Sequence, residues 1–170
     1  MRRVDSVPGA AHGCRTMTDP VAKPSPGRRK ILIMGLPGSG KTTLAKALLR
    51  RLNAVHFNAD AVRQEISKDL GFSEADRVEH ARRMGWLCDR VYEAGGYAVA
   101  DFICPTVETR AAFQQEGAAF IVWVDRIEKG RFEDTNRLFQ PPEQVDIRVT
   151  AEGTPEYWAC LLYTSPSPPD

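Results

Sequence analysis

The sequence has no long hydrophobic run and almost no net charge. No apolar stretch reaches the roughly 20 residues that a membrane-spanning helix needs. Its 23 lysines and arginines nearly balance its 22 aspartates and glutamates, which leaves a formal charge of +1. A chain so close to neutral has no overall attraction to nucleic acid or to a membrane surface. We therefore expect neither a membrane nor a nucleic acid as a partner.

Cysteine is also scarce. The four cysteines, Cys14, Cys88, Cys104 and Cys160, include no C-x-x-C pair, so neither a zinc site nor a disulfide framework is indicated. A reducing compartment is the default for such a chain, and we expect a cytoplasmic location. With 170 residues, 42% of them hydrophobic and 26% charged, the composition is typical of one globular domain.

The two ends differ in composition from the middle. Residues 1–29 are rich in Arg, Pro, Gly and Ser and lack the apolar segment of a secretory signal. We expect them to form a disordered N-terminal extension, with Met17 as an alternative start. The last residues, LLYTSPSPPD, resemble translated sequencing-adapter read-through, so 161–170 are expected to be a non-native tail. The folded domain is expected at residues 30–160.

Strands and helices alternate between these ends. Apolar runs predict strands at 30–34, 54–58, 97–102, 119–124 and 146–150. Leucines spaced by four residues predict a helix from Lys41 to about Leu52, and another helix should follow Pro105. A long helix is expected from Ser73, where S-x-x-D resembles a capping box, to the glycine pair 95–96. A last helix should begin at Thr154-Pro155.

This order predicts a three-layer α/β/α fold with a five-stranded parallel sheet. Repeated strand-helix-strand units with right-handed crossovers produce parallel strands covered by helices on both faces. Ligands of such sheets bind at the carboxyl ends of the strands. The residues that follow each strand are therefore the candidates for a functional site.

A phosphate-binding motif follows the first predicted strand. Residues 35–42, GLPGSGKT, fit the pattern G-x-x-x-x-G-K-[ST], and a strand before with a helix after argue against a chance glycine loop. Backbone N–H groups of such a loop converge on phosphate oxygens, helped by the helix dipole. Lys41 is expected to act in catalysis at the β- and γ-phosphates, and Thr42 to bind Mg²⁺. The expected ATP-binding residues are Gly35, Leu36, Pro37, Gly38, Ser39, Gly40, Lys41, Thr42 and Thr43.

The motif alone does not separate a kinase from a GTPase or a motor ATPase. The chain has no N-K-x-D element to specify guanine, and the domain is too small for most motors. A small P-loop kinase is therefore the expected class. On the acceptor side, Asp60 follows the second strand and could accept the proton of an attacking hydroxyl. Arg63, one helical turn on, could bind an anion. The alternative is a helix N-cap at Asp60 and a solvated Arg63.

The most specific stretch is LGFSEADRVEHARR, residues 70–83. It resembles the adenylylsulfate kinase family, which shows L-G-F-S-x-x-D-R-x-E-N-I-R-R. Residues 58–63, NADAVR, are similar to the family's D-G-D-x-x-R except at the first two positions. Residues 102–105, FICP, resemble its F-I-S-P, and Arg110 matches the arginine that follows. The likeness spans about residues 30 to 150.

The resemblance implies a reaction and a set of roles. The family transfers the γ-phosphate of ATP to the 3′-hydroxyl of adenosine 5′-phosphosulfate, giving 3′-phosphoadenosine 5′-phosphosulfate for sulfate assimilation. By position, Asp60 would be the general base, Arg63 and Arg77 would bind the phosphosulfate, and Phe72 would stack on adenine. Ile103 and His80, which stands in place of the family's Asn, would complete the acceptor site. Without the resemblance, Phe72 would be read as a core residue and Arg77 as a solvated helix residue.

Three further positions depart from the family. Cys104 replaces a serine, and Val107 stands where the family usually has arginine. Asp101 ends an apolar strand where the family usually has a small residue, and it resembles the Walker B aspartate that orients the Mg²⁺ shell. Asp101 is therefore expected to bind Mg²⁺ with Thr42, directly or through water.

The segment 125–137, which follows the fourth strand, corresponds to the family's lid. It keeps a Lys-Gly-x-aromatic element, so Lys129 and Arg131 are expected to close over ATP. An ordinary exposed loop is the alternative. For the whole chain, a kinase for another hydroxyl (a polynucleotide 5′-end, a nucleoside or a small metabolite) and a non-catalytic nucleotide-binding module also stay open, as does a homodimer.

Overall fold

The computed structural model describes residues 29–164. The expected N-terminal extension up to residue 28 and residues 165–170 of the expected tail lie outside the described residues. The strands are β1 (Lys30–Met34), β2 (Val55–Asn58), β3 (Ala98–Phe102), β4 (Phe120–Val124) and β5 (Ile147–Val149). The helices are α1 (Lys41–Leu49), α2 (Ala59–Glu65), α3 (Glu74–Glu93), α4 (Val107–Phe113), α5 (Glu133–Leu138) and α6 (Pro155–Thr164).

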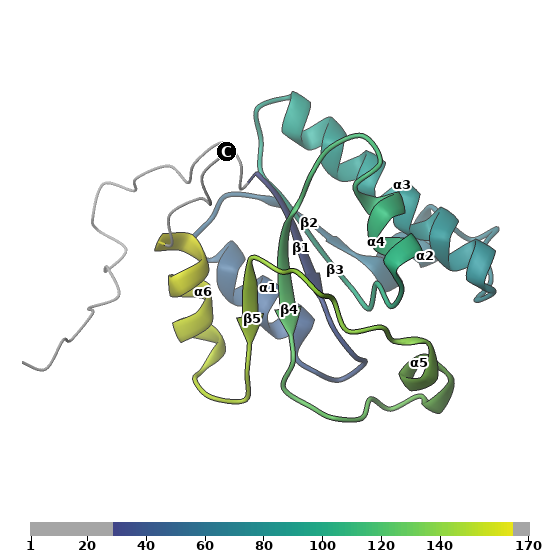
Figure 1. Ribbon diagram of the computed structural model, residues 1–170. Coiled ribbons are helices and arrows are strands. Elements are labelled where there is room, and N and C mark those ends of the chain that lie inside the picture. The colour runs from purple at the N-terminus through teal and green to yellow at the C-terminus, as the bar shows by residue number, and fades with distance from the viewer. Residues whose placement is uncertain (1–28, 165–170) are drawn as a thin grey trace, which may run out of the picture.

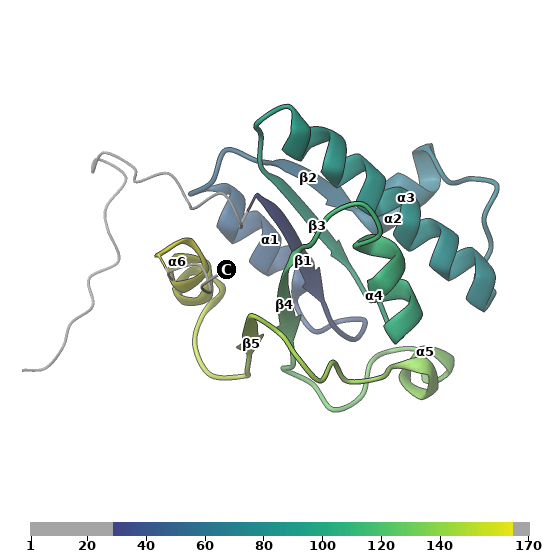
Figure 2. The ribbon, with the colours of Figure 1, turned by 45° about the horizontal axis from the view of Figure 1, so that its top comes forward.

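The five strands form one parallel sheet in the order β2-β3-β1-β4-β5. Figures 1 and 2 show α1 and α6 on one face of the sheet and α3 and α4 on the other. Each face has its own apolar core, because the side chains of β1 and β3 alternate between the two layers. The predicted three-layer fold is confirmed. Parallel pairing brings the carboxyl ends of β2, β3 and β1 to the same edge.

A close contact between α3 and α4 seats α4 on the sheet. A Cβ added at Gly85 would lie 2.1 Å from Phe113 O, so only glycine allows the two helices to approach this far. The Phe113 ring is fully buried, and its centroid lies 5.5 Å from that of Phe102 at the end of β3. This packing fixes the path of the chain where it leaves β3 for α4.

A buried lysine ties the same two helices to β1. Lys30, only 2% exposed, donates from Nζ to Asp89 Oδ1 in α3 at 2.7 Å. It also donates to the carbonyl oxygens of Phe113 and Gly117, both at 2.9 Å. All three donors of the ammonium group are thus used, which a buried charge requires.

Four helices differ from the predicted elements. Helix α1 ends at Leu49 rather than near Leu52, because its last turn tightens: Arg51 N donates to Leu48 O, a bond over three residues. Helices α2 and α5 were not predicted, since both are short and carry little apolar periodicity. Helix α6 continues to Thr164, and Leu162, which falls in the expected tail, is buried in the core.

Within residues 29–164 no helix is long and apolar enough to cross a bilayer. Cys88 and Cys104 are free and buried.

Lys30→Met is predicted to lower the free energy of unfolding by about 3–5 kcal/mol, because it leaves Asp89 buried without a counter-charge. Arg50→Met is the matched control, since Arg50 forms an exposed pair with Glu156 at 3.9 Å; that change should cost less than about 1 kcal/mol. Urea titrations of both variants measure the difference. Equal losses in the two variants would contradict the role given to the buried pair.

Candidate active site

A cavity of about 310 Å³ lies at the carboxyl ends of β1, β2 and β3. Its walls come from the P-loop, the start of α2, the segment before and within α3, the residues after β3, and residues 131–132. The structure brings most of the predicted site residues to this one cavity: Pro37, Gly38, Lys41, Thr42, Asp60, Arg63, Phe72, Arg77, His80, Asp101, Ile103 and Arg131. The predicted residues outside its lining are Gly35, Leu36, Ser39, Gly40, Thr43 and Lys129.

The P-loop is shaped by its glycines and closed by Lys41. A Cβ at Gly35 would lie 2.5 Å from Val124 O, and Gly40 adopts a φ of 100°, which favours glycine. Lys41 Nζ donates to Leu36 O at 2.8 Å, so the ammonium group lies over the loop. Burial lowers the pKa of Lys41 to about 8, although the carboxylates of Asp101 and Asp60 partly oppose this.

Asp101 lies beside Thr42 at the floor of the cavity. Its Oδ1 accepts a hydrogen bond from Asn58 Nδ2 at 3.0 Å and lies 3.2 Å from His56 Nε2. Within residues 29–164 its Oδ2 is buried and has no hydrogen-bond partner. Burial would raise the pKa of Asp101, but the polar contacts of His56, Thr42 and Asn58 outweigh it and hold that pKa below its usual value.

These residues fit a magnesium ion. Mg²⁺ prefers oxygen ligands and takes only one or two from protein side chains, the rest coming from water and phosphate. An ionised Asp101 with a free oxygen, close to the Thr42 hydroxyl, supplies that donor set. In the part of the chain that the structure describes, no three His, Cys, Asp or Glu side chains gather into a metal cluster. A metal held with the help of phosphate therefore suits the site, and an all-protein metal cage does not.

Asp60 lies in the first turn of α2, exposed on the wall of the cavity. The N-cap of α2 is Asn58, whose Oδ1 accepts from Ala61 N at 3.1 Å. The alternative that made Asp60 a capping residue is wrong, because its carboxylate is not used by the helix end. It is therefore available to a ligand.

Two arginines flank the Phe72 ring. The guanidinium carbons of Arg63 and Arg77 lie 4.7 and 5.8 Å from the ring centroid, within cation–π range. Arg63 donates to Gly71 O at 2.6 Å, and Arg77 Nε donates to Phe72 O at 2.9 Å. Phe72 is 69% exposed, so the alternative that it is a core residue is wrong. Burial, followed by the charge of Arg77, lowers the pKa of Arg63, although Asp60 and Asp76 partly oppose this.

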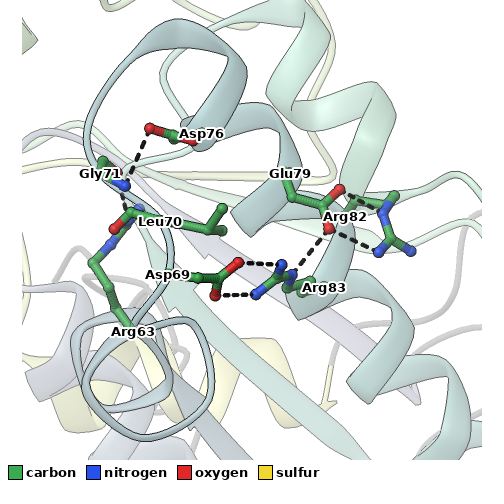
Figure 3. A network of polar contacts seen from close by, with 8 residues as sticks. All are labelled: Arg63, Asp69, Leu70, Gly71, Asp76, Glu79, Arg82 and Arg83. Carbon is green, nitrogen blue, oxygen red and sulfur yellow. Dashed lines mark hydrogen bonds and ion pairs between the residues drawn. The ribbon is translucent and has the colours of Figure 1, made fainter.

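The rest of the 70–83 stretch holds the loop before α3 in place (Figure 3). Arg83 binds both carboxylate oxygens of Asp69, at 2.7 and 2.8 Å, and also donates to Glu79. Arg82 forms a two-bond pair with Glu79 as well. These two arginines lie outside the cavity lining, and Arg83 binds the loop through Asp69, whereas Arg63 and Arg77 border the cavity.

His80 is buried under the first residue of α2. It is 4% exposed, and its Nε2 lies 3.2 Å from Ala59 O, so that nitrogen carries the proton and donates. Burial, and next the charge of Arg63, lower the pKa of His80 to about 4. The ring is therefore neutral at pH 7, and its Nδ1, which has no partner among the described residues, is an acceptor.

The chain leaves β3 through a strained turn that borders the cavity. Cys104 has a φ of 46°, which is uncommon for a residue other than glycine, and its carbonyl accepts from Arg110 at 3.2 Å. Burial raises the pKa of the Cys104 thiol to about 12, so the thiol is neutral. Val107 is exposed and does not line the cavity.

The segment 125–137 lies against the P-loop. A Cβ at Gly38 would lie 3.3 Å from Arg131 Nε, and one at Gly40 would lie 3.5 Å from an Arg126 nitrogen. Asn136 of α5 holds the segment by exchanging two hydrogen bonds with Gly130, at 2.8 and 3.0 Å. Lys129 is exposed, away from the cavity.

Several residues of the site were missed from the sequence as contributors. Asn58, Thr109 and Phe132 line the cavity, and His56 contacts Asp101 from the neighbouring strand. Asn58 had a signal, since it occupies the first position of the D-G-D-like element. Phe132 also had one, as the aromatic residue of the Lys-Gly-x-aromatic element. His56 and Thr109 had none, because their roles depend on the pairing and packing of distant segments.

Three features together define a P-loop kinase. They are the P-loop between β1 and α1, the strand order of the sheet, and an adjoining cavity with a carboxylate and two arginines. The chain belongs to the adenylylsulphate kinase family, whose model matches residues 28–150. It is 38% identical over 107 residues to an adenylyl-sulfate kinase of Synechococcus sp. (strain JA-3-3Ab), covering 58% of this chain and 61% of the relative. It is 40% identical over 90 residues to one of Bacillus licheniformis, covering 50% and 46%. The chain thus spans less than two thirds of these relatives.

Solved structures show the same fold. The Mycobacterium tuberculosis APS kinase CysC, in complex with AMPPNP and APS, superposes with a TM-score of 0.66 at 24% identity, covering 78% of this chain and 94% of that one. A hexameric APS kinase of Thiobacillus denitrificans gives 0.62 at 26% identity, covering 79% and 28%. A gluconokinase of Sinorhizobium meliloti gives 0.61 at 16% identity, covering 83% and 93%.

The affinity for ADP is predicted to fall as the pH rises above about 8, by at most about tenfold per pH unit. The pKa of free Lys41 is lowered to about 8, and bound phosphates favour its charged form, so binding above that pH must take up a proton. Calorimetry at pH 8.5 in two buffers of different ionisation enthalpy measures this uptake. The Lys41→Arg variant stays charged and should take up fewer protons when ADP binds. Equal proton uptake by the two proteins would contradict the assignment of this uptake to Lys41.

Proposed function

We propose that the protein transfers the γ-phosphate of ATP to the 3′-hydroxyl of adenosine 5′-phosphosulfate, with Mg²⁺ as the metal. The observation that carries the proposal is the second half of the cavity. There Asp60, Arg63, Arg77 and Phe72 occupy the positions that the family pattern gives to the acceptor site. Sulfate assimilation, and a cytoplasmic location where ATP is available, belong to the same proposal.

On the donor side the chain supplies positive charge and backbone N–H groups. The P-loop amides and the start of α1 bind the β-phosphate, and Lys41 reaches the β- and γ-phosphate oxygens. Thr42 and Asp101 would hold Mg²⁺, which neutralises charge on the phosphate oxygens when it is bound. Arg131 already lies against Gly38, and with Lys129 it would close over ATP.

On the acceptor side the chain supplies two cations and a flat apolar face. Arg63 and Arg77 would bind the phosphosulfate, and Phe72 would stack on adenine. Both guanidinium groups donate to the carbonyl oxygens of residues 71 and 72 and contact the Phe72 ring. The acceptor would replace these contacts with stronger, charged ones. His80 and Ile103 would border the bound nucleotide.

Asp60 would act as the general base. Its carboxylate is exposed on the cavity wall, is not consumed by the cap of α2, and belongs to the same short helix as Arg63. A phosphosulfate held by the arginines would therefore place the ribose of the acceptor near Asp60. Positioning of the hydroxyl in line with the γ-phosphate would supply most of the rate.

A kinase for another small hydroxyl acceptor is the second candidate. Val107 puts no cation in the place of the family's arginine and lies outside the cavity. The acceptor side thus has one charge fewer than the family pattern.

An assay of ADP release with Mg·ATP tests the proposal. Release is measured with and without adenosine 5′-phosphosulfate, and also with a nucleoside, gluconate or a 5′-hydroxyl oligonucleotide as the acceptor. Release should depend on adenosine 5′-phosphosulfate. Asp60→Asn should lower kcat by about 10²–10⁴-fold while ADP still binds. Glu65→Gln, at the far end of α2, is the matched control and should leave kcat unchanged. Release with another acceptor only, or an unchanged kcat in Asp60→Asn, would refute the proposal.

A further inference from the structure

One side chain, Asn58, joins four elements at the edge of the sheet. Its Oδ1 accepts from Ala61 N and so caps α2, while its Nδ2 donates to Asp101 Oδ1 on β3 at 3.0 Å. The same Nδ2 lies 3.4 Å from Thr42 Oγ1 at the start of α1. Asn58 and Asp101 are also register partners of the paired strands β2 and β3, so their side chains leave the sheet side by side.

This contact pairs one amide with one carboxylate. Without a bound cation, two ionised carboxylates at this distance would repel each other. The family pattern carries Asp at the position of Asn58 and a small residue at that of Asp101, whereas this chain carries Asn and Asp. The two departures are therefore complementary. Each pattern has one carboxylate at this point of the site, but it comes from β2 in the family pattern and from β3 in this chain.

The Asn58 amide also determines which oxygen of the Asp101 carboxylate stays without a hydrogen bond. Asn58 Nδ2 and His56 Nε2 both approach Asp101 Oδ1. Oδ2 is consequently without a partner among residues 29–164, although the Asp101 side chain is only 1% exposed. A buried charged oxygen without a partner is costly, and an oxygen-seeking cation beside Thr42 would satisfy it.

We propose that the metal-holding carboxylate of this chain is supplied from β3 by Asp101, and that Asn58 on β2 is the positioning residue that presents its Oδ2. The two positions are equivalent for the metal, so that exchanging the residues between strands keeps the metal site. The inference rests on the nucleotide-binding half of the proposed function and does not depend on the identity of the acceptor.

Mn²⁺ binding in the presence of ADP, followed by electron paramagnetic resonance, tests the exchange without any turnover. Asp101→Asn should weaken Mn²⁺ binding by at least about tenfold. The exchanged variant, Asn58→Asp with Asp101→Asn, should recover affinity to within about threefold of the original protein, since the carboxylate again lies at this point. Asn53→Asp adds the same charge before the other end of β2 and, combined with Asp101→Asn, should restore nothing.

A second pair of variants tests the exchange in case the first pair does not fold. Asp101→Ser, with and without Asn58→Asp, repeats the exchange with a small residue on β3, and metal-free ADP binding confirms that each variant keeps its P-loop. Recovery in either exchanged variant supports the proposal. The proposal is overturned if Asp101→Asn binds Mn²⁺ like the original protein, or if both exchanged variants bind as weakly as their Asp101 parents. A failure of adenosine 5′-phosphosulfate as acceptor would leave these results unchanged, which separates the two proposals.

Discussion

The parallel register of β2, β3 and β1 is the constraint on which the site depends. It places Asn58 opposite Asp101, and Asp101 opposite Ile33 just before the P-loop, so residues far apart in the sequence meet at one edge. A shift of one residue in β3 would turn Asp101 into the opposite layer, away from Lys41 and Thr42. The buried Lys30, which ties the start of β1 to α3 and α4, helps to hold that register from the other end of the strands.

The acceptor half of the cavity is organised by a different device. The loop before α3 is held by an ion pair and a hydrogen bond: Arg83 binds Asp69, and Asp76 accepts from Gly71 N. Phe72 is thereby presented to solvent between Arg63 and Arg77, at the cost of exposing a large apolar ring. An aromatic face between two cations suits a ligand that has both a base and an anionic group.

Much of this could be predicted from local patterns. The P-loop, the strand before it and the Ser73 cap of α3 depend on near neighbours in the chain, and the structure has them where the sequence predicts them. The capping-box pattern was wrong for the side chain of Asp76. Its carboxylate accepts a hydrogen bond from Gly71 N and does not close a capping box on Ser73. The exposure of Phe72, the partners of Asp101 and the position of Arg131 against Gly38 follow from strand pairing and loop packing, which no short pattern encodes.

The most direct measurement of the central claim is the fate of the transferred phosphate. The protein is incubated with Mg²⁺, ATP labelled at the γ-phosphate and adenosine 5′-phosphosulfate, and the nucleotide product is isolated and examined by mass spectrometry and ³¹P NMR. The account predicts that the label lies on the 3′-oxygen of the intact phosphosulfate nucleotide. Label found only in inorganic phosphate, or on a different hydroxyl, would contradict it.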